Sequence, residues 1–225
     1  MDTYIIAERG DWGSTILQTM PRLPRVLRSL RPTWSLASVC AIDADFLVSV
    51  GISALIWDVD GTLTHHHACE FAPDTMAHFQ RLTEAPDLAH VILSNCGESR
   101  LADLGTLFPD IPVVKGYRTS SGPVGRVRHG STEVWRGVPV GELTPLRKPD
   151  PALIEISLDV LAVRNRQSVA IVGDQHLTDI AAANLAGIRS IKVPTVGRNS
   201  CPPVVRALQH VDSACFHLAE AVRRV

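Results

Sequence analysis

The chain has 225 residues, of which 45% are hydrophobic, and its formal net charge is -1. This length and apolar content suit one compact domain with a sizeable core, and the near-neutral charge excludes the broad basic surface that non-specific nucleic-acid binding requires. The five cysteines are widely spread without a CxxC pair. They indicate ordinary thiols of a reducing compartment and exclude a disulfide framework.

Residues 1–35 are expected to form an N-terminal extension. They lack the pattern of a signal peptide, and no unbroken apolar run in the chain is long enough for a membrane-spanning helix, so we expect a cytoplasmic protein. Within the extension, residues 20–34 place a stripe of apolar residues at helical spacing beside four arginines. This basic amphipathic segment either packs on the domain with its arginines in solvent or makes a peripheral contact with the inner membrane face. The sequence leaves both alternatives open.

Residues 36–225 are expected to form the main domain, in which strands and helices alternate. Apolar runs predict strands at 53–59, 88–94, 111–114, 168–174 and 189–194. Helical patterns and cap signals predict helices near 43–51, 73–84, 97–105, 150–163, 178–186, 203–211 and 214–223. This alternation predicts an α/β fold with three layers, in which helices cover both faces of a doubly wound, mostly parallel, Rossmann-like sheet. Ligands of such sheets bind outside the carboxyl ends of the strands.

An insertion at about 116–147 interrupts this alternation. It holds six glycines between residues 116 and 141, together with an aromatic pair and several arginines. We expect a long irregular loop or a hairpin, which would serve as a small lid over the site. No other segment could cover the site, because only about 30 residues separate the strand expected at 53–59 from the end of the strand expected at 88–94, too few for a large helical cap.

Two acids follow the first buried strand, in the run "LIWDVDGTLT". Asp58 and Asp60 stand where the strand ends, and Gly61 lets the backbone turn sharply. Two carboxylates so close together repel each other unless a cation neutralises them. Mg²⁺ suits such a site, because it takes a few protein oxygens and leaves room for water and phosphate. Alone, this pair is weak evidence, since surface turns often contain one.

Further polar groups follow the other predicted strands. Ser94 and Asn95 end the second strand, where a hydroxyl and an amide could hold a phosphoryl oxygen near a helix N-terminus. Lys148 precedes a capped helix and is suited to neutralising phosphoryl charge. Asp174 ends a later strand, and Asp179 follows it as a second acid. We therefore expect these side chains to converge on one edge of the sheet.

With these residues in this order, the sequence resembles the haloacid dehalogenase (HAD) superfamily of phosphohydrolases. "DVDGT" resembles the first motif of the superfamily, Ser94 the second, Lys148 the third and "GDQHLTD" the fourth, in the same order. The leader before the first motif and the "GDQHLTD" motif also resemble the branch that contains phosphatidylglycerophosphate phosphatases. The resemblance implies a Mg²⁺-dependent phosphomonoester hydrolase that acts on phosphatidylglycerophosphate or another anionic phosphate ester.

The resemblance also implies a role for each motif residue. Asp58 would be the nucleophile and form an aspartyl-phosphate, and Asp60 would protonate the leaving alcohol, activate water and offer its carbonyl to Mg²⁺. Asp58 and Asp174 would ligate the metal, with Asp179 in its shell, and Ser94 and Lys148 would complete the catalytic set. Gly61, Thr62 and Asn95 would contact the substrate. Dehalogenases of the superfamily lack the acid at the position of Asp60, which favours a phosphatase.

Two alternatives remain at the level of the sequence. The chain could transfer the phosphoryl group to another alcohol, as the phosphomutases of the same superfamily do. It could also be a binding protein that kept the fold and lost the chemistry. We expect a phosphorylated small molecule or lipid as the partner, and neither nucleic acid nor an obligate protein partner.

Several histidines and a cysteine near the motifs have simpler interpretations. His65, His66 and His67 cannot all face one ion from a regular element, so a flexible flap is favoured over a transition-metal site. His176 lies within the fourth motif and is either near the metal or solvated at a helix start. Cys96 follows the second motif, where it is either redox-sensitive or a small packing residue.

Overall fold

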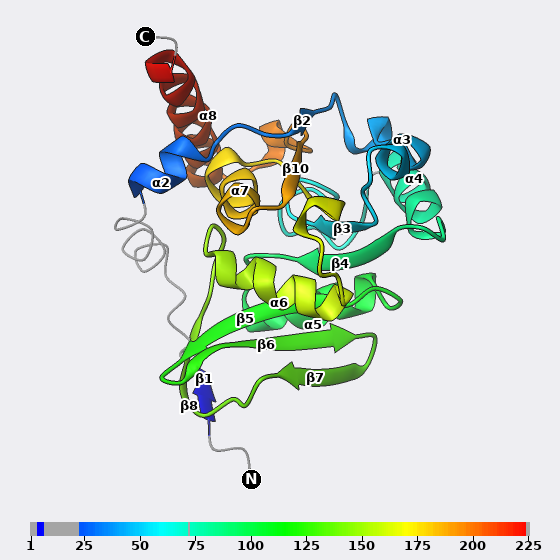
Figure 1. The fold of residues 1–225 in the computed structure, drawn as a ribbon, viewed down its shortest axis with the longest axis vertical. Coiled ribbons are helices and arrows are strands. Elements are labelled where there is room, and N and C mark those ends of the chain that lie inside the picture. The colour runs from blue at the N-terminus through cyan, green and yellow to red at the C-terminus, as the bar shows by residue number, and fades with distance from the viewer. Residues whose placement is uncertain (1–3, 7–22, 72, 224–225) are drawn as a thin grey trace.

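The centre of the molecule is a parallel sheet whose strands are buried on both faces. The computed structural model describes residues 4–6, 23–71 and 73–223, and Figure 1 shows this sheet between helices. The parallel part has the strand order β5-β4-β3-β9-β10-β2. These strands are β5 (Val113–Thr119), β4 (Ala89–Leu93), β3 (Ala54–Trp57), β9 (Val169–Gly173), β10 (Arg189–Lys192) and β2 (Trp34–Ser35). The expected three-layer, doubly wound α/β fold is confirmed.

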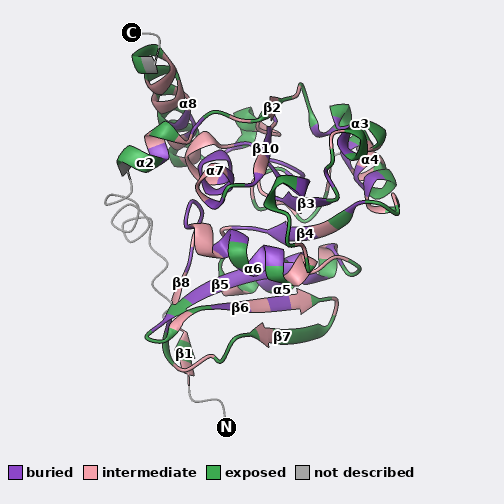
Figure 2. Ribbon diagram, viewed as in Figure 1, coloured by how far each residue is buried: buried purple, intermediate pink, exposed green. Residues whose placement is uncertain are grey.

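Alternation along each central strand builds one apolar cluster on each face of the sheet. On β3, Leu55 and Trp57 pack with one group of helices, and Ala54 and Ile56 pack with the other. The first group consists of α3 (Ala44–Ser49), α4 (Pro73–Thr83) and α5 (Glu98–Leu107), and the second of α6 (Pro151–Leu161) and α7 (Ala181–Ala186). Figure 2 shows the buried residues along these strands. Because burying each large apolar side chain contributes roughly 1.5–3 kcal/mol, this alternation fixes the register of the strands.

Local signals in the sequence set the helix ends. Asp43 accepts a hydrogen bond from the backbone N–H of Phe46 at 2.6 Å, and Asp150 accepts one from Ala152 N–H at 3.0 Å. Gly187 ends α7 with a φ of +73°, a left-handed conformation that favours glycine. The short turns η2 (Val39–Ala41), η3 (Arg166–Ser168) and η5 (Arg198–Ser200) connect other elements.

The insertion at 116–147 is a part of the sheet. Its first residues continue β5, which pairs with β6 (Gly122–His129) in an antiparallel hairpin, and β7 (Thr132–Arg136) pairs with β6. β8 (Gly141–Pro145) pairs antiparallel with β5 on its other side. Of the two forms expected for this segment, the structure contains the hairpin and not the irregular loop. The physical reason is that glycines at these positions allow close packing: a Cβ at Gly116 would lie 2.5 Å from a methyl group of Leu153 on α6.

The described part of the N-terminal extension packs on the domain. β1 (Tyr4–Ile6) pairs in parallel with β8, and α2 (Leu23–Arg28) contacts α7 and α8. Val26 and Leu30 are buried against Ala181, while Arg25 and Arg31 are exposed. The first of the two alternatives for the basic segment is thus seen for these residues. Residues 7–22, which include the start of that segment, lie outside the described residues.

A single long helix ends the fold. α8 (Pro203–Arg223) replaces the two helices expected near 203–211 and 214–223, and Asp212 near its middle is buried, with its carboxylate bonded to the backbone of the domain. The helix expected at 178–186 begins earlier, with a π-type turn, η4 (His176–Ile180), that leads into α7. Across the described residues, every helix is too short or too polar to cross a membrane.

Candidate active site

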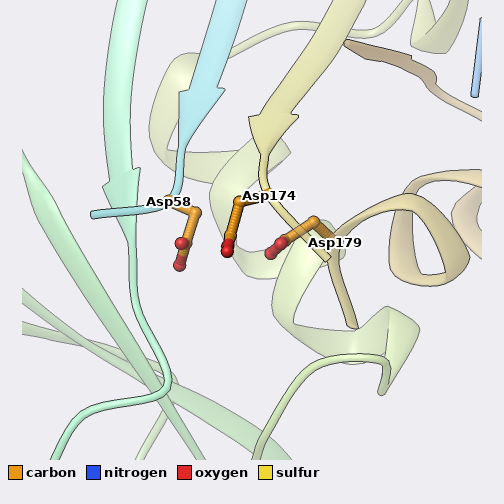
Figure 3. A group of neighbouring side chains, drawn as sticks. All are labelled: Asp58, Asp174 and Asp179. Carbon is orange, nitrogen blue, oxygen red and sulfur yellow. The ribbon is translucent and has the colours of Figure 1, made fainter. Parts of the chain in front are cut away.

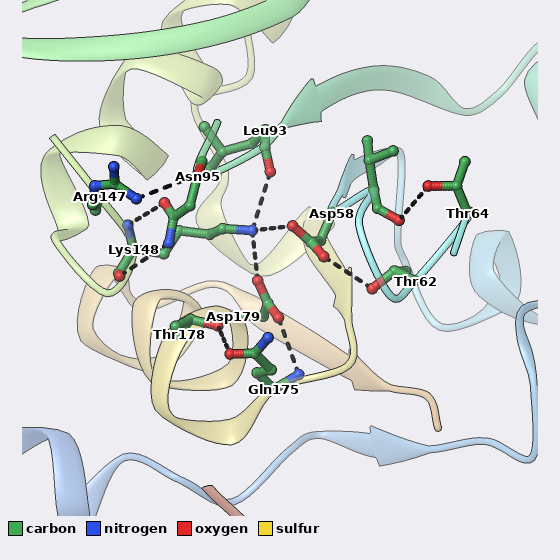
Figure 4. Close-up of polar contacts among 11 residues, drawn as sticks. Asp58, Thr62, Thr64, Leu93, Asn95, Arg147, Lys148, Gln175, Thr178 and Asp179 are labelled. Carbon is green, nitrogen blue, oxygen red and sulfur yellow. Dashed lines mark hydrogen bonds and ion pairs between the residues drawn. The ribbon is translucent and has the colours of Figure 1, made fainter. Parts of the chain in front are cut away.

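A buried lysine joins two of the aspartates at the carboxyl edge of the sheet. The ammonium group of Lys148 donates to Asp58 Oδ1 at 2.5 Å, to Asp179 Oδ1 at 2.6 Å and to the carbonyl of Leu93 at 3.1 Å (Figure 4). The two carboxylates raise the pKa of Lys148 above its ordinary value against the opposing effect of burial. Residues that lie 90 and 31 positions from the lysine are thereby brought to one point.

The neighbouring strands β3 and β9 place the two strand-end acids side by side. Asp58 follows β3, and its backbone N–H donates to the carbonyl of Val172 on β9 at 3.0 Å, so the pairing continues to the acid itself. Asp174 follows β9. Asp58, Asp174 and Asp179 each offer a carboxylate oxygen, and these oxygens lie within 4.8 Å of one another (Figure 3). The expected convergence of the motif residues is present in the geometry.

The donor set fits a divalent cation. Asp174 Oδ2 accepts a hydrogen bond from Thr195 at 2.7 Å, but Oδ1 is buried without a hydrogen-bond partner among the described residues. Burial, then Asp58 and Asp179, raise the pKa of Asp174 to about 8, and burial above all raises the pKa of Asp58 to about 7. A cation at this point would give the orphaned oxygen a partner and favour the ionised carboxylates. Oxygen ligands of this kind suit Mg²⁺.

Asp179 is oriented by bonds to both of its oxygens. Oδ1 accepts from Lys148, and Oδ2 accepts from the backbone N–H of Gln175 at 3.1 Å. η4 carries it, and the π-type bond from Ile180 N–H to Gln175 O, 3.2 Å long, closes that turn. Both oxygens of Asp179 therefore have donors, as both oxygens of Asp58 do, whereas Asp174 keeps one oxygen without a partner among the described residues.

The turn after Asp58 depends on a glycine. Gly61 has a φ of +92°, and a Cβ there would lie 2.9 Å from Asp174 Oδ2. Thr62 donates from its hydroxyl to Asp58 Oδ2 at 3.1 Å. Gly61 lines the cavity, as a substrate-contacting residue would, whereas Thr62 does not line it and its hydroxyl contacts Asp58. Thr62 therefore orients Asp58.

Asp60 is not one of the three clustered acids, although it lines the same cavity as Asp58 and Asp179, and it pairs with Arg100. The guanidinium donates to Asp60 Oδ1 at 2.8 Å and to the carbonyl of Ala68 at 2.6 Å, and His67 N–H donates to the same Asp60 oxygen at 3.0 Å. Arg100 is only 5% exposed. No motif pointed to this arginine, and the one signal for it was its place on the inward side of α5, beside Leu101.

The two polar residues after β4 have different positions. Ser94 is buried and lines the cavity, as expected for a group that holds a phosphoryl oxygen. Asn95 was expected to bind substrate, but both ends of its amide contact the backbone of Lys148. Its Oδ1 accepts from Lys148 N–H at 2.7 Å, and its Nδ2 donates to Lys148 O at 3.3 Å. Its amide is thus directed to the lysine.

The histidines flanking the motifs lie in different surroundings. His176 stacks on Phe216 with ring centroids 4.0 Å apart, and its Nδ1 lies 2.9 Å from the carbonyl of Leu30, so it faces α2 and α8. His65 Nδ1 lies 3.1 Å from the hydroxyl of Ser200, while His66 and His67 line the cavity. Among the described residues, the potential metal ligands that cluster are the three aspartates, not these histidines.

Cys96 and the buried Lys115 fix the far side of the second-motif loop. Burial raises the pKa of the Cys96 thiol, which agrees with its interpretation as a packing residue. Lys115, on β5, donates to the Cys96 carbonyl at 2.8 Å and pairs with Glu98 at 2.7 Å. Two residues of the segment expected to be a lid, Tyr117 and Arg126, donate to the same Glu98 carboxylate at 2.6 Å each, so that segment also supports the end of this loop.

A cavity of about 300 Å³ opens above these groups. Asp58, Asp60, Lys148 and Asp179 form its catalytic side. Its outer wall comes from the loop after the nucleophile and from α8, and includes His66, His67, Cys201, Val205 and Gln209. Among the described residues of the expected lid at 116–147, only Arg147, the last one, lines this cavity, so the hairpin of that segment does not cover the site. A second cavity, of about 360 Å³, adjoins it and includes Asp174.

Comparison with known proteins gives one informative match. Residues 145–220 match the family model described as HAD-hydrolase-like, a segment shorter than half of the chain. This match supports the HAD superfamily. It includes Lys148, Asp174 and Asp179 of the site, and it supports a hydrolase-type activity. No curated protein matches the chain. One solved structure, an uncharacterized protein from Listeria monocytogenes serotype 4b, is similar over 67% of this chain and 85% of that chain, at 15% identity and a TM-score of 0.40. A likeness this distant carries no argument.

Proposed function

We propose that the chain is a Mg²⁺-dependent phosphomonoester hydrolase that acts through an aspartyl-phosphate on Asp58. The observation that carries this proposal is the contact of the Lys148 ammonium with both Asp58 and Asp179, beside the orphaned oxygen of Asp174. A structural ion pair alone would not require a third buried acid with an unsatisfied oxygen. The HAD-hydrolase-like match over residues 145–220 supports the same chemistry.

In the first step, a carboxylate oxygen of Asp58 forms a bond to phosphorus while the bond from phosphorus to the leaving oxygen breaks. Asp60 supplies the proton that the leaving alkoxide takes up. Arg100 and His67 N–H occupy Asp60 Oδ1, so we assign this proton to Oδ2. Ser94 and the Lys148 ammonium are placed to hold phosphoryl oxygens.

In the second step, Asp60 takes a proton from water as the water oxygen bonds to phosphorus. The bond between phosphorus and the Asp58 oxygen then breaks, which returns the free carboxylate and releases inorganic phosphate. Asp58 and Asp174 would hold Mg²⁺, with the Asp60 carbonyl, and Asp179 would support that shell. When bound, the ion supplies positive charge that keeps the nucleophile ionised and offsets charge on the phosphoryl group.

The substrate we propose is an anionic phosphate ester, with phosphatidylglycerophosphate as one member of the class. The resemblance of the leader and of the "GDQHLTD" motif supports the lipid, and the exposed Arg25 and Arg31 would lie toward an anionic membrane surface. Because Val26 and Leu30 are buried in the domain, any such contact would be electrostatic.

A phosphate-release screen tests the activity. The purified chain with Mg²⁺ would be given sugar phosphates, nucleotides, lysophospholipids, and vesicles that contain phosphatidylglycerophosphate. We expect release that disappears with a chelator and with Asp58→Asn, and that survives Asp103→Asn, a matched change at an exposed acid on α5. Turnover on none of these esters would refute the proposal. Isomerised product in place of free phosphate would identify a phosphomutase, and a cellular role that survives Asp58→Asn would identify a binding protein.

A further inference from the structure

Two cations follow each other in the chain at the edge of the cavity. The side chain of Lys148 enters the catalytic side, while Arg147 lines the same cavity from the preceding position. In Figure 4 the Arg147 guanidinium lies on the other side of Asn95 from Asp58. The catalytic lysine and this arginine are therefore directed to different parts of one cavity.

The backbone that carries the two cations is held in place. Asn95 bonds to the N–H and the carbonyl of Lys148, and the Arg147 carbonyl accepts from Asp150 N–H at 2.9 Å. Arg147 also donates to the carbonyl of Asn95, at 3.5 Å. This arrangement fixes the spacing between the position of the transferred phosphoryl group and the guanidinium.

The composition and size of the cavity narrow the kind of group that fits near Arg147. At about 300 Å³ the cavity is at the small end of ligand sites, so it holds the phosphoryl group and a short polar portion of the leaving group. His66, Gln175 and Gln209 line it together with Arg147, and apolar atoms, including those of Val205, contribute the rest of the lining. A long acyl chain would have to lie outside.

We propose that Arg147 binds a second anionic group, a carboxylate or a phosphodiester, on the leaving-group side of the substrate. This inference rests on the proposed function. A guanidinium presents a planar fork of N–H donors that matches such groups, and charge-assisted bonds of this kind are roughly twice as strong as neutral ones. Burial lowers the pKa of Arg147 from its ordinary value, and an anion bound to the guanidinium favours its charged form.

A matched pair of substrates tests the proposal. Glycerol 3-phosphate and 3-phosphoglycerate carry the same kind of phosphomonoester, but only the second has a carboxylate at its other end. We expect the chain to prefer 3-phosphoglycerate in kcat/KM, and Arg147→Gln to lower the ratio of the two kcat/KM values by about 10–100-fold. Arg147→Lys should restore part of the ratio. Arg136→Gln, an exposed arginine on β7, should leave it unchanged.

The outcomes separate this inference from the proposed function. If Arg147 contacts the transferred phosphoryl group instead, both substrates lose activity equally in Arg147→Gln, the ratio stays constant and the inference is wrong. Binding is measured independently, by calorimetry of both compounds with Asp58→Asn, with and without Arg147→Gln. Arg147-dependent preference for 3-phosphoglycerate in binding, without turnover by the native chain, would leave this inference standing and refute the proposed hydrolase.

A further set of substrates identifies which kind of molecule carries the second anionic group. The water-soluble glycerophosphoglycerophosphate headgroup carries a phosphodiester, and vesicles of phosphatidylglycerophosphate present the same group on a membrane. Arg147-dependent cleavage of both assigns the anion to a lipid headgroup. Cleavage of 3-phosphoglycerate alone assigns it to a free carboxylate ester. If Arg147→Gln changes neither, the proposal is overturned.

Discussion

Asn95 holds Lys148 by both ends of one amide: its Oδ1 accepts from the lysine N–H at 2.7 Å, and its Nδ2 donates to the lysine carbonyl at 3.3 Å. Residues from β4 and from the start of α6, far apart in the chain, are thereby fixed to each other. The lysine ammonium can then reach Asp58 and Asp179 together. The position of this buried cation therefore depends on a neighbour with no charge.

The first prediction follows from this contact. In Asn95→Ala the backbone of Lys148 loses two partners, so its ammonium should shift from Asp58 and lower kcat by about 10–100-fold, with a smaller change in KM. Phosphate release under saturating substrate measures this. Asn199→Ala, at an exposed asparagine, is the matched control. An unchanged kcat in Asn95→Ala would show that the amide does not position the lysine.

Alanine substitutions at Gly51 and Gly61 compare backbone strain alone with backbone strain plus a steric clash. Gly61 and Gly51 have φ values of +92° and +82°, but only at Gly61 would a Cβ meet Asp174 Oδ2, at 2.9 Å. Both alanine variants should lose roughly 1 kcal/mol of unfolding free energy through strain. Gly61→Ala should in addition lower Mg²⁺ affinity at least about 10-fold, because it displaces a ligand. Urea unfolding and calorimetry with Mg²⁺ measure the two effects, and equal Mg²⁺ affinity in both variants would contradict the assignment of Asp174.

Mg²⁺ should stabilise the fold through the three clustered aspartates. At a hundredfold excess over its dissociation constant, an ion bound only to the folded state adds about 2.7 kcal/mol, or roughly 5–10 °C in Tm for a domain of this size. Asp174→Asn should remove most of this gain, whereas Asp103→Asn should keep it. Thermal unfolding with Mg²⁺ and with a chelator makes the measurement. A gain that persists in Asp174→Asn would place the ion elsewhere.

His90 should make the fold less stable at acidic pH. Its Nδ1 accepts from the indole N–H of Trp57 at 3.0 Å, and burial lowers its pKa from 6.5 to about 4. Between these two values the unfolded chain binds a proton that the folded chain does not, so stability falls as the pH drops through 6.5 and stops falling below about 4. From pH 7 to pH 5 the loss from this group is about 2 kcal/mol.

Urea unfolding at the two pH values checks this prediction. His90→Gln keeps an acceptor for Trp57 but does not titrate, so it should lose about 2 kcal/mol less than the native chain over this range. His129→Gln, at an exposed histidine on β6, should behave like the native chain. An equal pH dependence in His90→Gln would show that His90 is not the group responsible.

The sequence predicted the parts of the site that follow from strand ends. Asp58 and Asp174 come directly after apolar runs, so the topology of a parallel sheet was enough to bring them to one edge. Arg100 could not be found this way, because its role depends on which turn of α5 faces Asp60. Thr195 could not either, since a loop far from any motif places its hydroxyl on Asp174.

The largest difference in the fold concerns the glycines of the insertion. In the sequence they indicated a loop, because glycine is the usual residue of turns. In the structure Gly116 and Gly125 lie inside strands, where the absence of a Cβ lets β5 and β6 approach Leu153 and Ile156 of α6. That use of glycine is visible only when the facing helix is known. The reassignment turns an expected cover into a support for the Cys96 loop.

The carboxylate of Asp212, on α8, accepts from the backbone N–H groups of His176 at 3.1 Å and Leu177 at 2.7 Å, at the start of the turn that carries Asp179. During synthesis on the ribosome, the strands and the acids of the candidate site are made before this clamp. A nascent chain that has not yet reached residue 212 would hold the motif residues without this anchor for their last member. The turn that carries Asp179 is therefore fixed only after Asp212 has been added to the chain.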